Sequence, residues 1–198
     1  LIIFTSDNGG AGYIGLHDIN KPYRGWKLTH FEGGMHIPFF AKWPDKIKKN
    51  TKYDKRIHHT DIFSTILGAA DIKPPKNIQI DGKNLIPYLT DKKIGEPHET
   101  LYWKNATYQA IIHDDWKLMR SEYPKKQEYL FDLKNDPYEK NNLADVEIDI
   151  KNSLHHMMDK HVKSMPKPKW PQSIFMPVTI DNPITEYKEG DELIYWPN

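Results

Sequence analysis

The sequence predicts an α/β protein in which a mostly parallel sheet flanked by helices is followed by a small α+β subdomain with an antiparallel sheet. Three observations predict this fold class. Residues 1–4 are apolar without alternation, as in a strand that is covered on both faces. Residues 60–70 carry apolar side chains at helical spacing. Four β-favouring segments then follow at hairpin spacing between residues 100 and 133, which favours an antiparallel sheet.

Composition narrows the classes of function. The chain has 198 residues, with 28 Lys and Arg against 27 Asp and Glu, and a net charge of +1 argues against a general nucleic-acid binder. No apolar run approaches the roughly 18 residues of a membrane span, so we expect neither nucleic acid nor a membrane as a partner. The sequence has no cysteine, which excludes disulfides, thiolate metal sites and a cysteine nucleophile within it.

The first expected strand leads into Asp7, Asn8, Gly9 and Gly10. Ligands of α/β sheets bind at the carboxyl ends of strands. A carboxylate and an amide oxygen are hard donors that suit Ca²⁺ or Mg²⁺, and the glycines let the backbone turn away without a Cβ atom. The same four residues are also typical of a tight hairpin turn. The pattern alone therefore leaves a metal site and a simple turn open.

The next segment contains a loop and a second strand. Residues 11–23 have the composition of a loop, whose His17 either faces the pocket beside Asp7 or lies exposed to solvent. The glycine pair at positions 33 and 34 permits a sharp turn into an expected strand at residues 37–43.

Several features of residues 1–47 occur in a fixed order and spacing. They are Ser6-Asp7-Asn8-Gly9, Arg24-Gly25, the Lys27-x4-Glu32-Gly33-Gly34 spacing, Pro38-Phe39 and Trp43-Pro44. The stretch TSDNGG…KPYRGWKLTHFEGGMHIPFFAKWPDKI resembles the second signature region of the formylglycine-dependent sulfatases, in the alkaline-phosphatase superfamily. One departure is His36, where that family usually has Arg, and it affects a local contact.

The resemblance extends through the next helix. Residues 58–70 look like the helix that follows in sulfatases, and Thr60 is expected to cap its start. Its expected apolar face comprises Ile62, Phe63, Ile66, Leu67 and Ala70. His58 and His59 precede this helix, where a surface histidine pair is favoured over a metal pair.

Beyond the helix, the resemblance places a domain boundary. Residues 81–89 look like the segment that closes the large sulfatase domain, and residues 114–144 resemble the C-terminal sulfatase subdomain. We therefore assign residues 1–95 to the C-terminal portion of an alkaline-phosphatase-like catalytic α/β domain. Residues 96–198 are assigned to the antiparallel-sheet subdomain, with a helix and an extended tail.

Within this subdomain the sequence predicts four strands and one helix. The strands are expected at residues 100–103, 108–113, 116–120 and 128–133. A helix is expected at about residues 145–164. Its His155 and Asp159 lie four positions apart, but the pattern is not His-Glu-x-x-His, so a polar helix face is favoured over a metal site.

The resemblance implies roles for individual residues. By resemblance, Asp7 and Asn8 are the family's second pair of metal ligands, for Ca²⁺ or Mg²⁺, and Lys27 is one of its two catalytic lysines. A divalent cation polarises sulfate oxygens, and a lysine neutralises the charge of the transferred group. We expect Lys27 to contact the sulfate, and His17 is a further candidate for substrate binding. The implied activity is hydrolysis of a sulfate monoester, with a sulfated carbohydrate as the expected substrate, and the family suggests a periplasmic, extracellular or lysosomal location.

The sequence also predicts that essential parts lie elsewhere. The family's nucleophile motif, Cys- or Ser-x-Pro-Ser/Ala-Arg, has no counterpart in the chain. Ca²⁺ takes six to eight oxygen ligands, and Asp7 and Asn8 are two. The chain starts without Met inside an expected buried strand, so we expect the formylglycine nucleophile and the remaining ligands upstream of Leu1. The chain is then the C-terminal part of a sulfatase and is inactive by itself.

Two other functions remain open at this point. The first is a phosphodiesterase or phosphonate hydrolase of the same superfamily, although such enzymes favour more acidic and histidine metal ligands than this Asp-Asn pair. The second is a non-catalytic module that binds sulfated glycans through the basic loop at residues 42–55 and its aromatic side chains.

Overall fold

The computed structural model describes residues 1–197, which form two compact units. The first unit comprises Leu1–Asp7 and Pro38–Leu101, and the second comprises Asn8–Ile37 together with the chain from Tyr102 onward. The domain boundary predicted at residues 95 and 96 stays a prediction, since these units reflect contacts within this chain alone.

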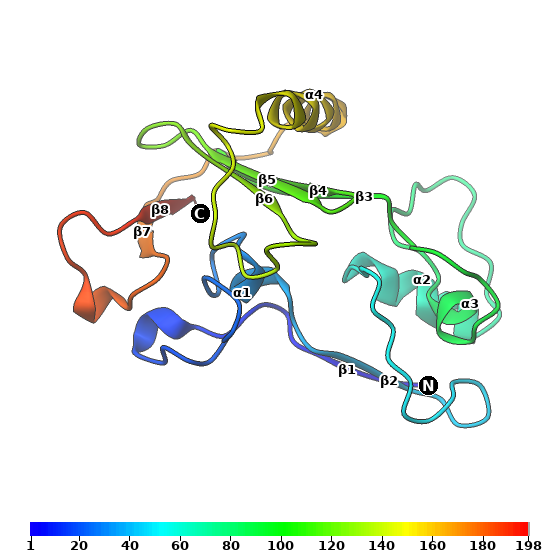
Figure 1. The fold of residues 1–198 in the computed structure, drawn as a ribbon. Helices are drawn as coiled ribbons and strands as arrows, with labels where there is room; N and C mark the ends of the chain where they lie inside the picture. Colours follow the sequence, from blue (N-terminus) through cyan, green and yellow to red (C-terminus); the bar gives the residue numbers. More distant parts are fainter. Residues whose placement is uncertain (198) are drawn as a thin grey trace. The chain divides into compact units, whose positions relative to one another are not determined.

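The first unit contains a two-stranded sheet and two helices. Strand β1 (Ile2–Thr5) pairs antiparallel with β2 (Phe39–Lys42) (Figure 1). The described residues do not supply the doubly covered parallel sheet that the sequence predicts for β1. Ile2 and Phe4 are 64% and 67% exposed, because their face of the sheet has no covering layer among the described residues.

Helix α2 (Thr60–Ala69) differs from its predicted form at the cap and at the buried face. Thr60 makes no capping hydrogen bond and is the first helical residue. Instead, the carboxylate of Asp61 accepts the backbone N–H of His58 at 2.7 Å. The side chains that α2 buries are Asp61 and Thr65, whereas Phe63 and Ile66 of the predicted apolar face are more than half exposed. The unit also contains α3 (Ile86–Leu89).

The second unit is built on an antiparallel sheet in the order β3-β4-β5-β6. Its strands are β3 (Thr100–Asn105), which starts at the end of the first unit, β4 (Tyr108–His113), β5 (Trp116–Ser121) and β6 (Gln127–Asp132). All four predicted strands are confirmed to within two residues at each end. The mixed α/β fold class with an antiparallel subdomain is confirmed as well.

Both faces of this sheet are covered, because side chains alternate along its strands. On one face, Ile111, Leu118 and Leu130 pack against Leu154 and Met158 of helix α4 (Ile148–Ser164), which lies along the sheet in Figure 1. The predicted helix is therefore confirmed and begins three residues later than expected.

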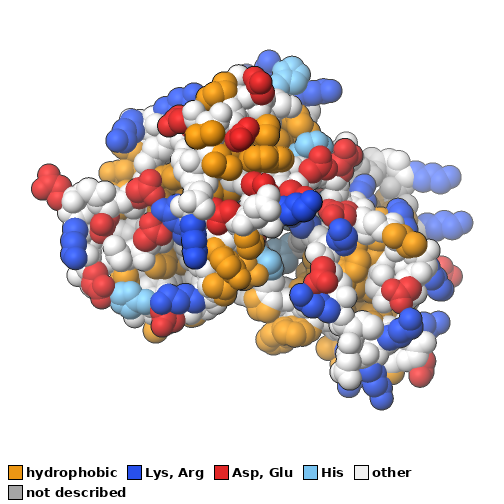
Figure 2. Space-filling model, viewed as in Figure 1, with side chains coloured by type: hydrophobic (Ala, Val, Ile, Leu, Met, Phe, Trp, Pro, Cys, Tyr) orange, Lys and Arg blue, Asp and Glu red, His pale blue; other side chains and the backbone are white. Residues whose placement is uncertain are grey.

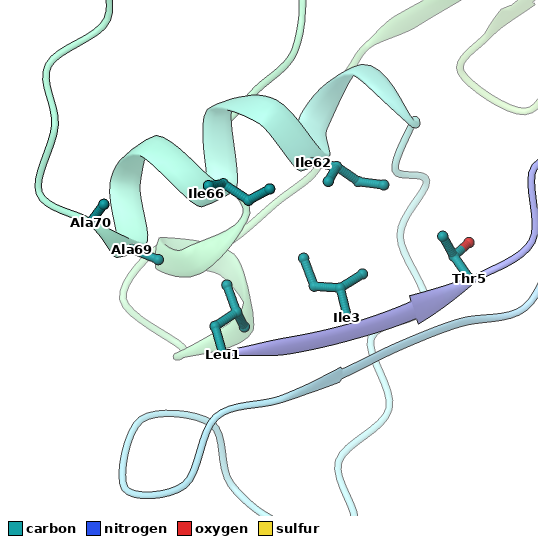
Figure 3. A pocket seen from close by; sticks show the side chains of 7 residues that line it. All are labelled: Leu1, Ile3, Thr5, Ile62, Ile66, Ala69 and Ala70. Atoms are coloured by element: carbon teal, nitrogen blue, oxygen red, sulfur yellow. The ribbon is translucent and has the colours of Figure 1, made fainter.

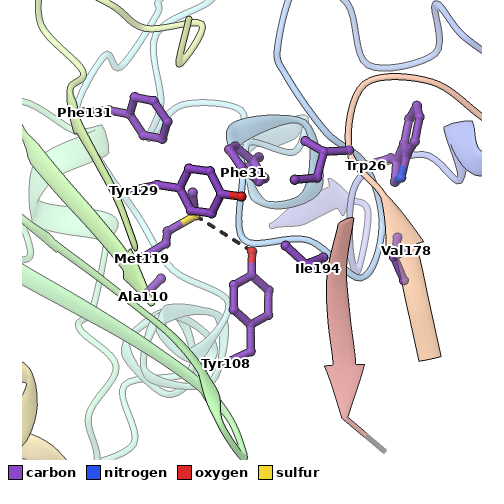
Figure 4. Packing of buried hydrophobic residues seen from close by; sticks show 10 residues of the cluster. Trp26, Phe31, Tyr108, Ala110, Met119, Tyr129, Phe131, Val178 and Ile194 are labelled. Carbon is purple, nitrogen blue, oxygen red and sulfur yellow. Dashed lines mark hydrogen bonds between the residues drawn. The ribbon is translucent and has the colours of Figure 1, made fainter. Parts of the chain in front are cut away.

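The other face packs against two segments that are distant in sequence. Its cluster contains Tyr108, Ala110, Met119, Tyr129 and Phe131 of the sheet, Trp26 and Phe31 of the loop around α1 (Glu32–Met35), and Val178, Ile180 and Ile194 (Figure 4). The last three residues come from the tail, where β7 (Phe175–Thr179) and β8 (Leu193–Pro197) form a hairpin. The tail therefore packs back on the subdomain. Short 3₁₀ helices are formed by Gly12–Ile14 and Ile184–Glu186.

Charge is mixed over the surface. On the face drawn in Figure 2, basic and acidic side chains are interspersed, in agreement with the net charge of +1. Among the residues described, none of the helices combines the length and hydropathy that a membrane crossing requires.

Candidate functional site

The turn after β1 carries the two predicted metal ligands. Asp7 is exposed and ends the first of the two segments that form the first unit, and half-buried Asn8 is the first residue of the second unit. The side-chain amide of Asn8 donates from Nδ2 to the carbonyl of Gly9 at 3.0 Å. A donated Nδ2 hydrogen fixes the orientation of the amide plane and therefore of its oxygen.

Gly9 and Gly10 are held by hydrogen bonds from two other parts of the loop. The N–H of Gly9 donates to the carbonyl of Gly34 at 2.9 Å. The side chain of Asn20 accepts from Gly10 N–H at 2.7 Å and donates to the carbonyls of Gly10 and Gly25 at 2.9 and 3.2 Å. The glycine turn is thus tied to both glycine-containing segments that the sequence singled out.

Lys27 lies in the same hydrogen-bonded frame. Its backbone N–H donates to the carbonyl of Gly10 at 3.1 Å, and the residue is half-buried. On one side, buried Trp26 donates from Nε1 to the carbonyl of Thr179 at 2.8 Å. On the other, Leu28 adopts a φ of 78°, a conformation that costs a non-glycine residue about 1–2 kcal/mol. The structure therefore brings the Asn8 turn and Lys27 together in the second unit.

His17 has a partner of its own. Its Nε2 lies 3.0 Å from Oε1 of Glu186, and the two side chains are 44% and 56% exposed. The contact is an exposed pair of modest energy, so it does not test the predicted role of His17 in substrate binding.

The donor set fits part of a hard-cation site. Asp7 and Asn8 offer the carboxylate and amide oxygens that Ca²⁺ and Mg²⁺ prefer, two of the six to eight that Ca²⁺ takes. Within residues 1–197, no group of three or more His, Cys, Asp or Glu side chains is placed to hold a metal ion. The two oxygens match the chemistry of such an ion, but further ligands from outside this set are needed to complete it.

His155 on α4 belongs to an ion-pair cluster. His155 Nε2 lies 2.7 Å from Glu128 Oε1, and Arg120 donates to Asp159 at 2.6 Å. This arrangement agrees with the predicted polar helix face. At the entrance to α2, exposed His59 bonds through Nε2 to the carbonyl of Ser6 at 2.8 Å.

A buried ion triad lies next to the candidate site, and the sequence did not reveal it. Lys117 on β5 has a fully buried side chain whose Nζ lies 2.8 Å from Glu32 Oε1 and 2.8 Å from Glu139 Oε1. Burial alone would raise the pKa of Glu32, but Lys117 and a hydrogen bond from His36 outweigh it and lower the pKa to about 2. Burial raises the pKa of Glu139, and the two carboxylates hold the pKa of Lys117 above its ordinary value in spite of its burial.

A signal for Lys117 was available in the sequence. Strand alternation places Lys117 on the same face as Met119, and a charge on a covered face requires a partner. Glu32 stood out only as part of the Lys27-x4-Glu32-Gly33-Gly34 spacing, and neither Glu32 nor Glu139 lies in an element whose periodicity would predict a pairing with Lys117.

An apolar pocket in the first unit is separate in character from these polar groups. Figure 3 shows it between β1 and α2, lined by Leu1, Ile3, Thr5, Ile62, Ile66, Ala69 and Ala70. Its lining contains one hydroxyl and no charged side chain, so it does not have the chemistry of an anion site.

Comparison with known proteins gives a consistent result. The family model of the C-terminal region of N-sulphoglucosamine sulphohydrolase matches residues 25–166. An uncharacterized sulfatase, YdeN, of Escherichia coli K12 is 45% identical over 103 residues, which is 52% of this chain and 18% of that protein. An N-acetylgalactosamine-6-O-sulfatase of Bacteroides thetaiotaomicron is 28% identical over 182 residues, which is 80% of this chain and 35% of that protein.

The fold also resembles solved structures. The crystal structure of the PsFucS1 sulfatase from Pseudoalteromonas matches with a TM-score of 0.68 at 24% identity, over 83% of this chain and 37% of that one. The chain thus spans between 18% and 37% of the length of these three proteins.

Proposed function

Because the chain belongs to the N-sulphoglucosamine sulphohydrolase C-terminal family of sulfatases, we propose that it contributes Asp7, Asn8 and Lys27 to a site that hydrolyses sulfate monoesters. The observation that carries this proposal is the hydrogen bond from Lys27 N–H to the carbonyl of Gly10 at 3.1 Å. It joins the turn that carries the oxygen donors to the segment that carries the cationic side chain.

The chemistry of the ester explains why these residue types are needed. A sulfate monoester is anionic, and its alkoxide is a poor leaving group. The Lys27 ammonium would hold the sulfate oxygens and neutralise their charge, and its half-buried position strengthens this attraction. Asp7 and Asn8 would hold a divalent cation, Ca²⁺ or Mg²⁺, which when bound supplies polarisation of the sulfate oxygens.

We propose a sulfated carbohydrate as the substrate and a site of action outside the cytoplasm. The substrate class is supported by the N-acetylgalactosamine-6-O-sulfatase among the relatives. The location rests on the family resemblance alone. His17 is retained as a candidate contact to the sugar.

The role of Lys27 can be tested in the whole protein that contains this chain. Lys27→Ala is expected to lower kcat for an aryl sulfate by roughly 10²–10³-fold, the usual cost of removing one group that stabilises developing charge. The matched control is Lys48→Ala, since Lys48 is an exposed lysine paired with Asp91, and it should leave kcat unchanged. Equal activity of the two variants would contradict the proposed role.

The chain by itself is expected to be inactive. It contains neither a cysteine nor a Ser-x-Pro-x-Arg sequence, so the family's nucleophile has no counterpart in it. The measurement is release of sulfate from an aryl sulfate by residues 1–198 alone, with the whole protein as positive control. Turnover by the chain alone would show that its own residues supply a nucleophile.

A further inference from the structure

The buried ion triad connects the antiparallel sheet to the loop that carries the proposed sulfate site. Lys117 Nζ lies 2.8 Å from an oxygen of each carboxylate. The second oxygen of Glu139 accepts the backbone N–H of Glu32 at 2.6 Å. Glu139 therefore binds both the side chain of the sheet lysine and the first backbone N–H of α1.

Glu139 is held in an unusual backbone conformation for this purpose. Its φ is 57°, and the residue is fully buried. A non-glycine residue keeps such a conformation only where its surroundings over-determine it, and such residues are concentrated at functional sites. Here the conformation directs the Glu139 carboxylate to Lys117 and to α1.

A short hydrogen-bonded path runs from α1 to the proposed site. The N–H of Gly33 donates to the carbonyl of Arg24 at 2.7 Å, and the carbonyl of Gly34 accepts from Gly9 at 2.9 Å. The backbones along this path are in close contact, since a Cβ atom at Gly33 would lie only 2.2 Å from the carbonyl oxygen of Gly25. A shift of α1 must therefore move the turn at Gly9.

Apolar anchors flank the triad. Phe31, directly before α1, is fully buried against Tyr129 and Phe131 (Figure 4), and the N–H of His30 donates to the hydroxyl of Tyr108 at 2.8 Å. These contacts already bury the loop. The charges are not required for that burial, since a buried ion triad is often no more stable than apolar residues of the same volume.

We propose that Lys117, Glu139 and Glu32 are positioning residues, which fix α1 and thereby set the placement of the Asn8 turn and Lys27. The effect on catalysis rests on the proposed function. The effect on the backbone at Gly9 and Lys27 does not. Loss of residues that orient metal ligands typically costs roughly 10–100-fold in metal affinity or activity, and we expect an effect of this size in the whole protein.

The test uses hydrogen exchange of the whole protein, together with binding of Ca²⁺ by calorimetry. Glu139→Gln keeps the shape of the side chain but removes its charge, and Lys117→Met removes the cation. The triple variant Lys117→Met, Glu32→Gln, Glu139→Gln leaves no unpaired buried charge and serves where a single variant does not fold. The matched control is Asp159→Asn, which breaks an ion pair of Arg120 on the same strand without touching α1.

The expected result is that amide exchange at Gly9 and Lys27 becomes at least roughly tenfold faster in the triad variants, while exchange in β4 is unchanged. Ca²⁺ binding is expected to weaken by roughly 10–100-fold, and the control should show neither change. A lower melting temperature with unchanged exchange at Gly9 and Lys27 would overturn the inference and leave the triad a purely stabilising role. If exchange changes as expected but the unaltered protein neither binds Ca²⁺ nor cleaves sulfate esters, the positioning stands and the proposed function fails.

Discussion

At the scale of single residues, the candidate site depends on glycines that allow backbone segments to touch. A Cβ atom at Gly9 would lie 1.8 Å from the carbonyl oxygen of Gly33. Gly9→Ala must therefore push the turn away from α1 and break the hydrogen bond to Gly34. We expect a loss of about 1–3 kcal/mol in the free energy of unfolding, measured by denaturant titration of the whole protein.

Gly10→Ala is the matched control for this change. A Cβ atom there would meet the side chain of Ile19 at 2.7 Å, and a side chain can move where a carbonyl of a packed turn cannot. The loss of stability should be smaller than for Gly9→Ala. Equal losses in the two variants would mean that the contact between the turn and α1 tolerates an added Cβ atom as well as the contact with Ile19 does.

His30 gives the protein a predictable dependence on pH. Burial, with the nearby Lys117 charge, lowers the pKa of His30 to about 3. Between the ordinary value of 6.5 and that value, the unfolded chain binds one more proton than the folded chain, so this residue makes stability fall as pH falls. The slope is about 1.4 kcal/mol per pH unit for one proton.

His30→Phe tests this dependence, because it keeps the ring stacked on Tyr108 at 4.1 Å without a titrating group. The unfolding free energy of both proteins is measured from pH 7 down to pH 4. The variant is expected to lose stability less steeply than the unaltered protein. Parallel curves would show that the pKa of His30 is the same in the folded and unfolded states, and would contradict the lowered value.

Some residues of the proposed site could be predicted from the sequence and others could not, for physical reasons. Asp7, Asn8 and Lys27 could be singled out because all three lie within one recognisable stretch of sequence, residues 6–34. The role of Glu139 could not be predicted, because it depends on a contact with Glu32, which lies 107 positions away. Local patterns carry no information on such a pairing.

At the scale of elements, α2 is fixed by a polar anchor. Asp61 is fully buried and accepts hydrogen bonds at 2.7 Å from the N–H groups of His58 and Lys83 and from Nε2 of His98. Burial raises the pKa of Asp61, but these hydrogen bonds outweigh it, so the pKa lies below its ordinary value of 3.8. The stabilisation is therefore present above about pH 4 and is lost as pH falls through the lowered pKa.

Asp61→Asn should remove most of this stabilisation. An amide cannot accept all three hydrogen bonds, and a hydrogen bond to a charged group contributes about 1.5–3 kcal/mol. The measurement is the melting temperature of the whole protein at pH 7 and at pH 3.5. The difference from the unaltered protein should shrink at the lower pH, and a difference that does not depend on pH would contradict this account.

Asp71→Asn is the control for that experiment. Asp71 is exposed just after α2 and has a φ of 56°, a conformation that Asn adopts readily. It should leave the melting temperature nearly unchanged.

Elements were predictable where the local composition and the turn residues around them agree. The strands β4 to β6 are short runs of β-favouring residues separated by turn residues, and they were found almost to the residue. For helix α2, the apolar residues Ile62, Ile66 and Ala70 point toward β1 as expected, but the two side chains that it buries fully, Asp61 and Thr65, are polar and were not predicted. The hairpin of β7 and β8 was not predicted, since Pro177 lies inside one strand and the tail shows no periodicity.

At the scale of the whole molecule, contacts between distant segments determine the second unit. Residues 8–37 join the subdomain through Trp26 and Phe31, which pack against residues up to about 170 positions later. The resemblance to sulfatases indicated the fold class, but no local pattern indicated this grouping. The proposed site depends on it, because the segment with Lys27 is anchored to the antiparallel sheet.

The most direct measurement is a crystal structure of the whole protein, grown with Ca²⁺ and a sulfated carbohydrate. The account predicts side-chain oxygens of Asp7 and Asn8 at about 2.3–2.6 Å from one cation, with Nζ of Lys27 within hydrogen-bond distance, about 2.7–3.2 Å, of a sulfate oxygen. A cation and sulfate bound elsewhere, with these three side chains pointing apart, would contradict it.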